Sequence, residues 1–280
     1  MASESNTLQL RPKALTIAGF DPSAGAGVLA DVRTFVAFGF QAVAAITSVT
    51  FQNTARVFGA IHQMGEAVRA QVMPLLEDDG IVCAKTGMQP TRDVVLEVAR
   101  LFRETNLPRP VVDPVIMSSS DHRLMEESAL AALIEELLPL ARLVTPNIPE
   151  AETLTGIAIT SEAEMRRAAA TIRELGARAV LIKGGHLKKQ KVEGSRQETG
   201  TDKALDGSDE AIDVLDNEGK VTVFRERRVS GAELHGSGCI LSAAIAAGLG
   251  QGKTLEDSVR AAKSFVLEAM RNSLREGQKF

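Results

Sequence analysis

Two glycines, a serine and a cysteine stand together at Gly236-Ser237-Gly238-Cys239, directly before an apolar run that predicts a buried helix over 240–249. The free N–H groups of a helix's first turn and the positive end of its dipole attract anions. The same field favours thiolate over thiol, so Cys239 is predicted to accept a proton near neutral pH. One interpretation is therefore a phosphoryl group held beside a base. The other is a glycine-rich turn into a helix, with Cys239 as a small buried residue.

Composition limits what this corner could belong to. The 280 residues are 44% hydrophobic, with a mean hydropathy of +0.01 and a net charge of −4. These values predict a soluble globular protein and argue against a nucleic-acid partner, which would need a basic surface. The two cysteines, Cys83 and Cys239, have no Cys-x-x-Cys spacing, so we expect neither zinc nor disulfides, and a cytoplasmic location. No apolar run reaches the roughly 20 residues of a membrane helix, so no membrane contact is expected.

Short apolar β-type runs alternate with longer helical patterns along the chain. The predicted strands are 14–18, 42–49, 80–84, 110–113, 143–145 and 179–182, and the predicted helices are 27–38, 65–76, 91–104, 127–138, 161–175, 240–249 and 255–274. This alternation predicts an α/β fold with a mostly parallel sheet covered on both faces, and ligands at the carboxyl ends of its strands. Pro74 is expected to kink or end its helix.

Other segments depart from that alternation. Residues 212–215 and 221–225 flank Asn217-Glu218-Gly219, which predicts a β-hairpin at one edge of the sheet. Residues 188–209 are rich in polar and charged side chains and are expected to form a mobile loop. We expect residues 1–13 to form a flexible tail and 14–280 a single domain.

A second glycine cluster follows the first predicted strand. The run Gly25-Ala26-Gly27-Val28-Leu29-Ala30 matches the G-x-G-x-x-A pattern of dinucleotide-binding proteins, which raises an NAD-dependent oxidoreductase as one alternative. That pattern also requires an acidic residue about 20 positions further on, yet none occurs between Asp31 and Glu66. A loop that brings backbone close to a small ligand, with Asp31 facing it, is the other alternative.

Seven segments in order carry a more specific signal. They are Ala14-Leu15-Thr16-Ile17-Ala18-Gly19 with Asp21-Pro22-Ser23 and Gly25-Ala26-Gly27, then Thr50-Phe51-Gln52-Asn53-Thr54, Ala84-Lys85-Thr86-Gly87-Met88, Val112-Asp113-Pro114-Val115, Thr145-Pro146-Asn147-Ile148-Pro149-Glu150-Ala151, Lys183-Gly184-Gly185-His186 and His235-Gly236-Ser237-Gly238-Cys239. Together they resemble the hydroxymethylpyrimidine/phosphomethylpyrimidine kinases of thiamine biosynthesis. The resemblance implies a ribokinase-like three-layer α/β/α fold. It also implies ATP-dependent phosphorylation of 4-amino-5-hydroxymethyl-2-methylpyrimidine and of its monophosphate, by a homodimer.

On the substrate side, the amide of Gln52 can donate and accept at the edge of an aminopyrimidine ring. The resemblance implies that Gln52 binds the pyrimidine, with Asp31 and Gly19 near the same pocket and Met88 and Val115 as apolar walls. Taken alone, Gln52 could equally be a loop amide, and Met88 and Val115 ordinary core residues.

On the nucleotide side, the resemblance implies that four residues serve ATP and Mg²⁺. They are Asp113, Asn147, Glu150 and Lys183. Magnesium keeps several waters, so Asp113 and Glu150 could hold it through water. Asn147 could instead cap a helix whose first turn contains Glu150. Gly236 and Gly238 would hold the γ-phosphate and Cys239 would remove the substrate's hydroxyl proton.

Alternatives and departures from the family pattern remain. A pyridoxal kinase of the cysteine-containing type shares the same chemistry, and a non-catalytic ligand-binding relative is a further alternative. Phe20 stands where Ser or Thr is usual, Ala24 where Gly is common, and Phe51 where a small residue is usual. A lysine that commonly follows Val115 is missing. We assign Lys183, and not Lys85, to the site.

Overall fold

A computed structural model describes residues 11–53, 56–118, 122–185, 210–228 and 235–276. Nine strands form one sheet in the order β3-β2-β1-β4-β5-β6-β7-β8-β9. Their bounds are β1 Lys13–Phe20, β2 Gln41–Gln52, β3 Val57–His62, β4 Ile81–Thr86, β5 Val111–Val112, β6 Leu143–Val144, β7 Ala179–Gly184, β8 Glu210–Asn217 and β9 Lys220–Arg227. The central strands from β2 to β7 pair in parallel, whereas β3 and the β8–β9 hairpin pair antiparallel at the two edges. The predicted mostly parallel sheet and its edge hairpin are confirmed.

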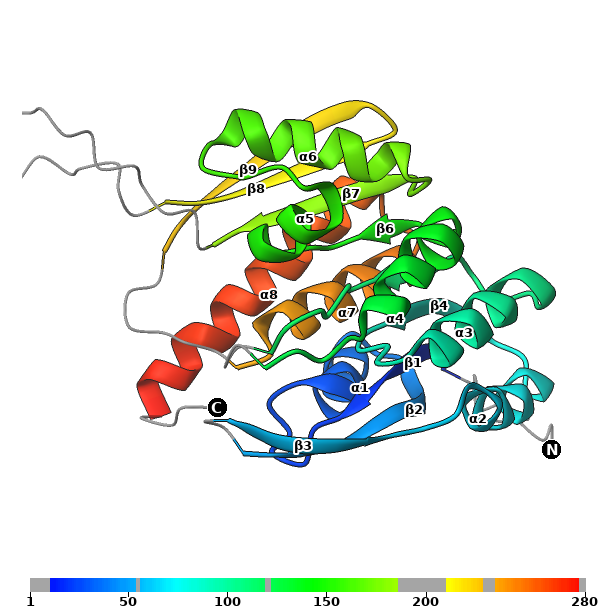
Figure 1. Cartoon of the computed structure of the whole chain (residues 1–280). Coiled ribbons are helices and arrows are strands. Elements are labelled where there is room, and N and C mark those ends of the chain that lie inside the picture. Colours follow the sequence, from blue (N-terminus) through cyan, green and yellow to red (C-terminus); the bar gives the residue numbers. More distant parts are fainter. Residues whose placement is uncertain (1–10, 54–55, 119–121, 186–209, 229–234, 277–280) are drawn as a thin grey trace, which may run out of the picture.

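Helices cover both faces of this sheet, which gives three layers (Figure 1). The helices are α1 Gly27–Ala37, α2 Gly65–Glu77, α3 Arg92–Glu104, α4 Glu127–Ala132, α5 Ile148–Thr155, α6 Glu162–Glu174, α7 Ser237–Gly250 and α8 Leu255–Glu276. One core cluster joins the sheet to α2 through α6, and a second joins it to α1, α7 and α8. Helix α7 is buried along nine consecutive residues, as expected of a helix that is apolar on every side.

Several boundaries differ from the sequence-based expectations. Helix α2 continues past Pro74 to Glu77, so of the two expected effects of Pro74, a kink or an end, the end is wrong. The predicted helix 127–138 is α4 followed by a π-helical turn over Leu133–Leu137 and a 3₁₀ turn over Leu138–Leu140. Strand β3 was not predicted, because its pattern is interrupted by Gly59 and its side chains are largely exposed.

The expected N-terminal tail and the expected mobile loop compare differently with the structure. Strand β1 begins at Lys13, inside the expected tail, because Lys13 pairs with Gln41 and Ile81. The predicted mobile loop 188–209 lies outside the described residues. No helix in the described part of the chain is both long and apolar enough to cross a membrane.

Candidate active site

The glycine corner lies at the start of α7 and is built against the loop that follows β1. Gly236 is the N-cap of α7 and has φ 76°, a left-handed conformation that favours glycine. A Cβ on Gly236 would lie 2.1 Å from the carbonyl oxygen of Gly25 and 2.8 Å from Cα of Ala26. The two glycine clusters of the sequence therefore meet backbone against backbone. This contact explains why glycine is needed at Gly236 for space as well as for conformation.

Lys183 brings a positive charge to the same corner. It lies in β7, and a Cβ on Gly238 would be 3.1 Å from its Nζ. Nζ also donates to Asp113 Oδ1 at 3.0 Å, and both side chains are largely buried. The predicted residues Gly238, Lys183 and Asp113 are thus brought together at the carboxyl ends of β5 and β7 and the amino end of α7.

Asp113 is held by more donors than Lys183 alone. Thr145 Oγ1 donates to its Oδ1 at 3.2 Å and Ser242 Oγ donates to its Oδ2 at 3.3 Å. Burial alone would raise the pKa of Asp113, but Lys183 and Lys85 outweigh burial and lower it. Asp113 is therefore ionised at neutral pH. Thr145 and Ser242 were not predicted as site residues, because Thr145 was noted only as the first residue of a motif and Ser242 lies within a run that indicates a buried helix.

Asn147 and Glu150 form a capping box at the start of α5. Glu150 N donates to Asn147 Oδ1 at 2.9 Å, and Asn147 N donates to Glu150 Oε2 at 2.8 Å. The capping role is therefore present. Asn147 also bridges to Lys183 as an isolated β-pair, which places the capping box beside the corner's lysine. Burial raises the pKa of Glu150 to about 7, although Lys183 opposes the rise.

Cys239 lies in the first turn of α7, and although part of the residue is exposed, protein atoms surround its sulfur. The sequence predicted a thiol with a lowered pKa. That prediction is wrong here, because burial raises the pKa of Cys239 to about 12 and the attraction of Lys85 only partly opposes it. The negative charges of Asp113 and Asp31 raise it further. At neutral pH the sulfur is therefore a thiol.

Asp31 and Lys85 form a buried ion pair beneath the corner. Lys85 Nζ lies 2.9 Å and 2.8 Å from the two carboxylate oxygens of Asp31, and neither side chain is exposed. Thr16 Oγ1 donates to Asp31 at 2.6 Å. Burial would lower the pKa of Lys85, but Asp31 and Cys239 outweigh burial and raise it. Lys85 was left out of the predicted site, because the sequence around it does not indicate that its side chain is buried.

The predicted substrate residues lie at the ends of β1, β2 and β4. Met88 packs on Gly19, where a Cβ would be 2.9 Å from the Met88 Sδ. Gln52 ends β2 and is partly buried, and Val115 is partly buried after β5. No contact in the described structure joins Gln52 to Asp31, whose carboxylate is directed to Lys85 and Thr16. Asp31 therefore lies below the surface that a substrate could reach.

The structure accounts for two positions, Ala24 and Phe51, at which the sequence departs from the family pattern. Ala24 has φ 61°, which is the conformation that explains why glycine is common there. Phe51 is 48% exposed, so its ring does not fill the interior of the site.

His235 and Asp21 are further site residues that the sequence analysis did not assign. His235 Nε2 lies 3.1 Å from Asp21 Oδ2, across the contact between the two glycine clusters. Burial would raise the pKa of Asp21, but hydrogen bonds from His235 and Ser23 outweigh it and hold the pKa at about 2. Only the shared His-Gly and Asp-Pro-Ser motifs could have drawn attention to them.

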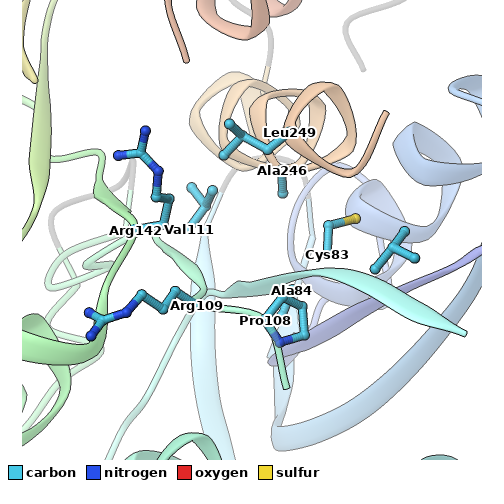
Figure 2. Close-up of a pocket in the computed structure, with 9 residues that line it drawn as sticks. Cys83, Ala84, Pro108, Arg109, Val111, Arg142, Ala246 and Leu249 are labelled. Carbon is cyan, nitrogen blue, oxygen red and sulfur yellow. The ribbon is translucent and has the colours of Figure 1, made fainter. Parts of the chain in front are cut away.

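A direct metal site and a ligand cavity each place requirements on the described residues. No group of three or more His, Cys, Asp or Glu side chains among them could hold a metal ion directly. A cavity of about 370 Å³ lies away from the corner, between β4, β5 and the C-terminal half of α7 (Figure 2). Its lining includes Cys83, Arg109, Arg142 and Leu249, and none of the predicted site residues.

Comparison with known proteins agrees with this arrangement. The family model "Phosphomethylpyrimidine kinase" matches residues 21–280. A hydroxymethylpyrimidine/phosphomethylpyrimidine kinase of Rhizobium meliloti is 41% identical over 258 residues, which cover 92% of this chain and 90% of that protein. A thiamine biosynthesis bifunctional protein of Geobacter sulfurreducens is 37% identical over 262 residues, which cover 93% of this chain and 49% of that protein.

Solved structures are similar over nearly the same length. The phosphomethylpyrimidine kinase of Clostridium difficile superposes with a TM-score of 0.76 at 34% identity, covering 93% of this chain and all of that one. The pyridoxal kinase of Staphylococcus aureus in complex with ADP superposes with a TM-score of 0.79 at 30% identity, covering 94% and 89%. The ribokinase-like fold, the glycine corner at the start of α7 and these matches agree with one another. The chain belongs to the phosphomethylpyrimidine kinase family.

Proposed function

We propose that this chain transfers the γ-phosphoryl group of ATP to the hydroxymethyl oxygen of 4-amino-5-hydroxymethyl-2-methylpyrimidine, and a second phosphoryl group to the monophosphate, in thiamine biosynthesis. The observation that carries the proposal is the corner itself. The amides from Gly236 to Cys239 lie at the N-terminus of the buried helix α7, and the ammonium of Lys183 lies beside Gly238. Amides at a helix start and an ammonium beside them suit the charge of a phosphoryl group in transfer.

The reaction has a simple balance. The acceptor oxygen bonds to the γ-phosphorus, the bond from that phosphorus to the ADP oxygen breaks, and the hydroxyl proton leaves to water. In a loose transition state the protein contributes chiefly alignment and charge. Since the pKa of Cys239 is about 12, we assign its thiol to holding the acceptor hydroxyl in line, and proton removal by a free thiolate is not required. Gln52 would bind the ring edge, with Gly19, Met88 and Val115 along the ring.

Magnesium would be held at Asp113 and Glu150. The oxygens of Asp113 already accept from Lys183, Thr145 and Ser242, so the donor set fits a hydrated ion bound through its waters. The ion would neutralise charge on the nucleotide phosphates. Asn147 and Lys183 complete the nucleotide side.

We also propose a cytoplasmic homodimer that pairs through the β2–β3 edge. Phe51 on β2 and Ile61 on the edge strand β3 lie on the same face of the paired strands and are 48% and 59% exposed, whereas Phe58, on the opposite face of β3, is 59% exposed. Such exposure of large apolar side chains at a sheet edge is unusual. The test is Ile61→Lys, with molar mass measured by light scattering. Conversion to monomer supports this face, and an unchanged dimer mass rejects it.

A pyridoxal kinase is the second candidate, since a pyridoxal kinase structure has a TM-score of 0.79 to this chain. The deciding experiment couples ADP release to a spectroscopic signal, with the hydroxymethylpyrimidine, its monophosphate and pyridoxal measured side by side. We expect kcat/KM for both pyrimidines to exceed that for pyridoxal. Turnover of pyridoxal alone would reject the pyrimidine assignment. Gln52→Leu should lower kcat/KM for the pyrimidine while leaving ADP affinity unchanged.

A further inference from the structure

A largely buried side-chain pair joins the loop after β1 to the segment that enters α7. His235 Nε2 lies 3.1 Å from Asp21 Oδ2, and the side chains are 18% and 2% exposed. Glycines on both sides make the approach possible, because a Cβ on Gly25 would be 2.2 Å from His235 Cδ2. The pair therefore lies between the end of a strand near the proposed pyrimidine site and the first turn of the helix that would hold phosphate.

Asp21 has no acceptor capacity left for a ligand. Its Oδ1 accepts from Ser23 N at 2.8 Å and Ser23 Oγ at 2.7 Å, and its Oδ2 accepts from Ala26 N at 2.9 Å and from His235. A carboxylate offers about four lone-pair sites, so these four donors fill them. Asp21 is therefore not placed to bind substrate or magnesium. The hydrogen bonds that the Asp21 carboxylate accepts fix the conformation of the loop and the position of His235.

His235 is placed to set the direction of the corner amides. It directly precedes Gly236, the left-handed residue from which α7 begins. Because Asp21 is ionised, Nε2 of His235 carries the hydrogen that the carboxylate accepts. Releasing this bond would free the residue before the N-cap, and the N–H groups of the first turn would lose their fixed aim.

We propose that His235 and Asp21 are a pair of positioning residues, which clasp the phosphate-binding corner to the loop beside the pyrimidine and so hold donor and acceptor in line. The inference rests on the proposed phosphoryl transfer. Neither side chain touches the reacting atoms. A displacement of about 1 Å in such alignment can lower a rate on the order of 100-fold, so the clasp should affect kcat far more than KM.

The variants separate positioning from folding. His235→Ala removes the donor, whereas His235→Gln puts an amide N–H near the position of Nε2. Asp21→Asn presents an NH₂ group to two donors, and Asp79→Asn at an exposed site is the matched control. We expect kcat to fall about 10- to 100-fold in His235→Ala with KM for the pyrimidine changed less than about threefold. His235→Gln should recover at least about a third of wild-type kcat, and Asp79→Asn should stay within about twofold.

The double variant tests whether the two residues act as one unit. If they do, Asp21→Asn combined with His235→Ala should lower kcat no further than about twofold below the worse single variant. Fully multiplicative losses would overturn the clasp. So would an unchanged kcat in His235→Ala, an effect on KM alone, or equal losses in His235→Ala and His235→Gln.

A second readout does not need the reaction. Hydrogen exchange of the Ile240 amide, which donates to Gly236 O at 3.0 Å and closes the first turn of α7, should be about tenfold faster in His235→Ala and restored in His235→Gln, with the exchange of β5 and β6 unchanged. If wild type lacks pyrimidine kinase activity, the proposed function fails and this exchange experiment still decides the clasp. Equal exchange in wild type and His235→Ala would overturn it.

Discussion

Replacing Lys85 with Met should destabilise the protein strongly, because it leaves the carboxylate of Asp31 buried with no cation. Both side chains of the pair are 0% exposed, and Lys85 Nζ contacts both oxygens of Asp31 at 2.9 Å and 2.8 Å. After the substitution, Thr16 is the remaining donor that the structure places on this carboxylate. Removing one partner of such a buried pair typically costs about 3–5 kcal/mol.

The magnitude can be converted into a thermal shift. For a chain of this size, each kcal/mol lowers Tm by roughly 2–4 °C, so Lys85→Met should lower Tm by about 6–20 °C. Asp31→Leu combined with Lys85→Met replaces the pair by two apolar side chains. Because an apolar replacement of a buried pair is often neutral or stabilising, the double variant should recover most of the loss.

Urea unfolding followed by circular dichroism measures these free energies. The matched control is Lys220→Met, which breaks a 3.9 Å pair with Glu256 where Lys220 is 77% exposed. Such surface pairs contribute less than about 1 kcal/mol, so the control should unfold close to wild type. A loss below about 1 kcal/mol in Lys85→Met, or a double variant as unstable as the single one, would refute the reasoning.

Three further predictions concern the corner and its neighbours. Gly236→Ala should abolish most activity and lower stability more than Gly252→Ala. The two glycines have similar φ values of 76° and 79°, but only a Cβ at Gly236 would collide with a neighbour, at 2.1 Å from the carbonyl oxygen of Gly25; equal losses in urea unfolding would contradict this. Alkylation of Cys239 by iodoacetamide, followed by mass spectrometry, should be slow at pH 7–8 and rise steeply toward pH 11, since its pKa is about 12; fast labelling at pH 7 would contradict the raised value. Glu150 has a folded pKa raised from 4.5 to about 7, so its stabilising effect is full below pH 4.5 and is lost as pH rises through 7. Urea unfolding of Glu150→Gln should therefore vary less between pH 5 and 8 than wild type, and identical pH profiles would argue against the shift.

Much of the fold was predictable because it depends on patterns that repeat. Strands buried on both faces read as short apolar runs, and α7 reads as a continuous apolar helix, so the parallel sheet and its layers followed from sequence. Strand β3 did not, because Gly59 and exposed side chains give it neither alternation nor a continuous apolar run. Helix α2 continues through Pro74, whose local preference was outweighed by packing of the turns on either side.

The roles of the site residues stay predictions, but the structure shows which of them lie together and what surrounds them. Gly238, Lys183 and Asp113 lie together because the carboxyl ends of the parallel strands β5 and β7 are at the same edge of the sheet, where α7 begins. The raised pKa of Cys239 depends on burial and on the carboxylates of Asp113 and Asp31, which are far away in sequence. The pairing of Asp31 with Lys85 depends on the same kind of long-range contact, 54 positions apart.

The ion pair between Lys183 and Asp113 has a consequence for how a nucleotide could enter. An ammonium carries three hydrogens, and Asp113 takes one of them at 3.0 Å. Two hydrogens remain for phosphate oxygens, so an arriving triphosphate need not compete with the carboxylate for its cation. The Lys183 side chain is only 14% exposed and is already held by Asp113 before a nucleotide arrives, so most of the free-energy cost of burying its charge is met when the chain folds.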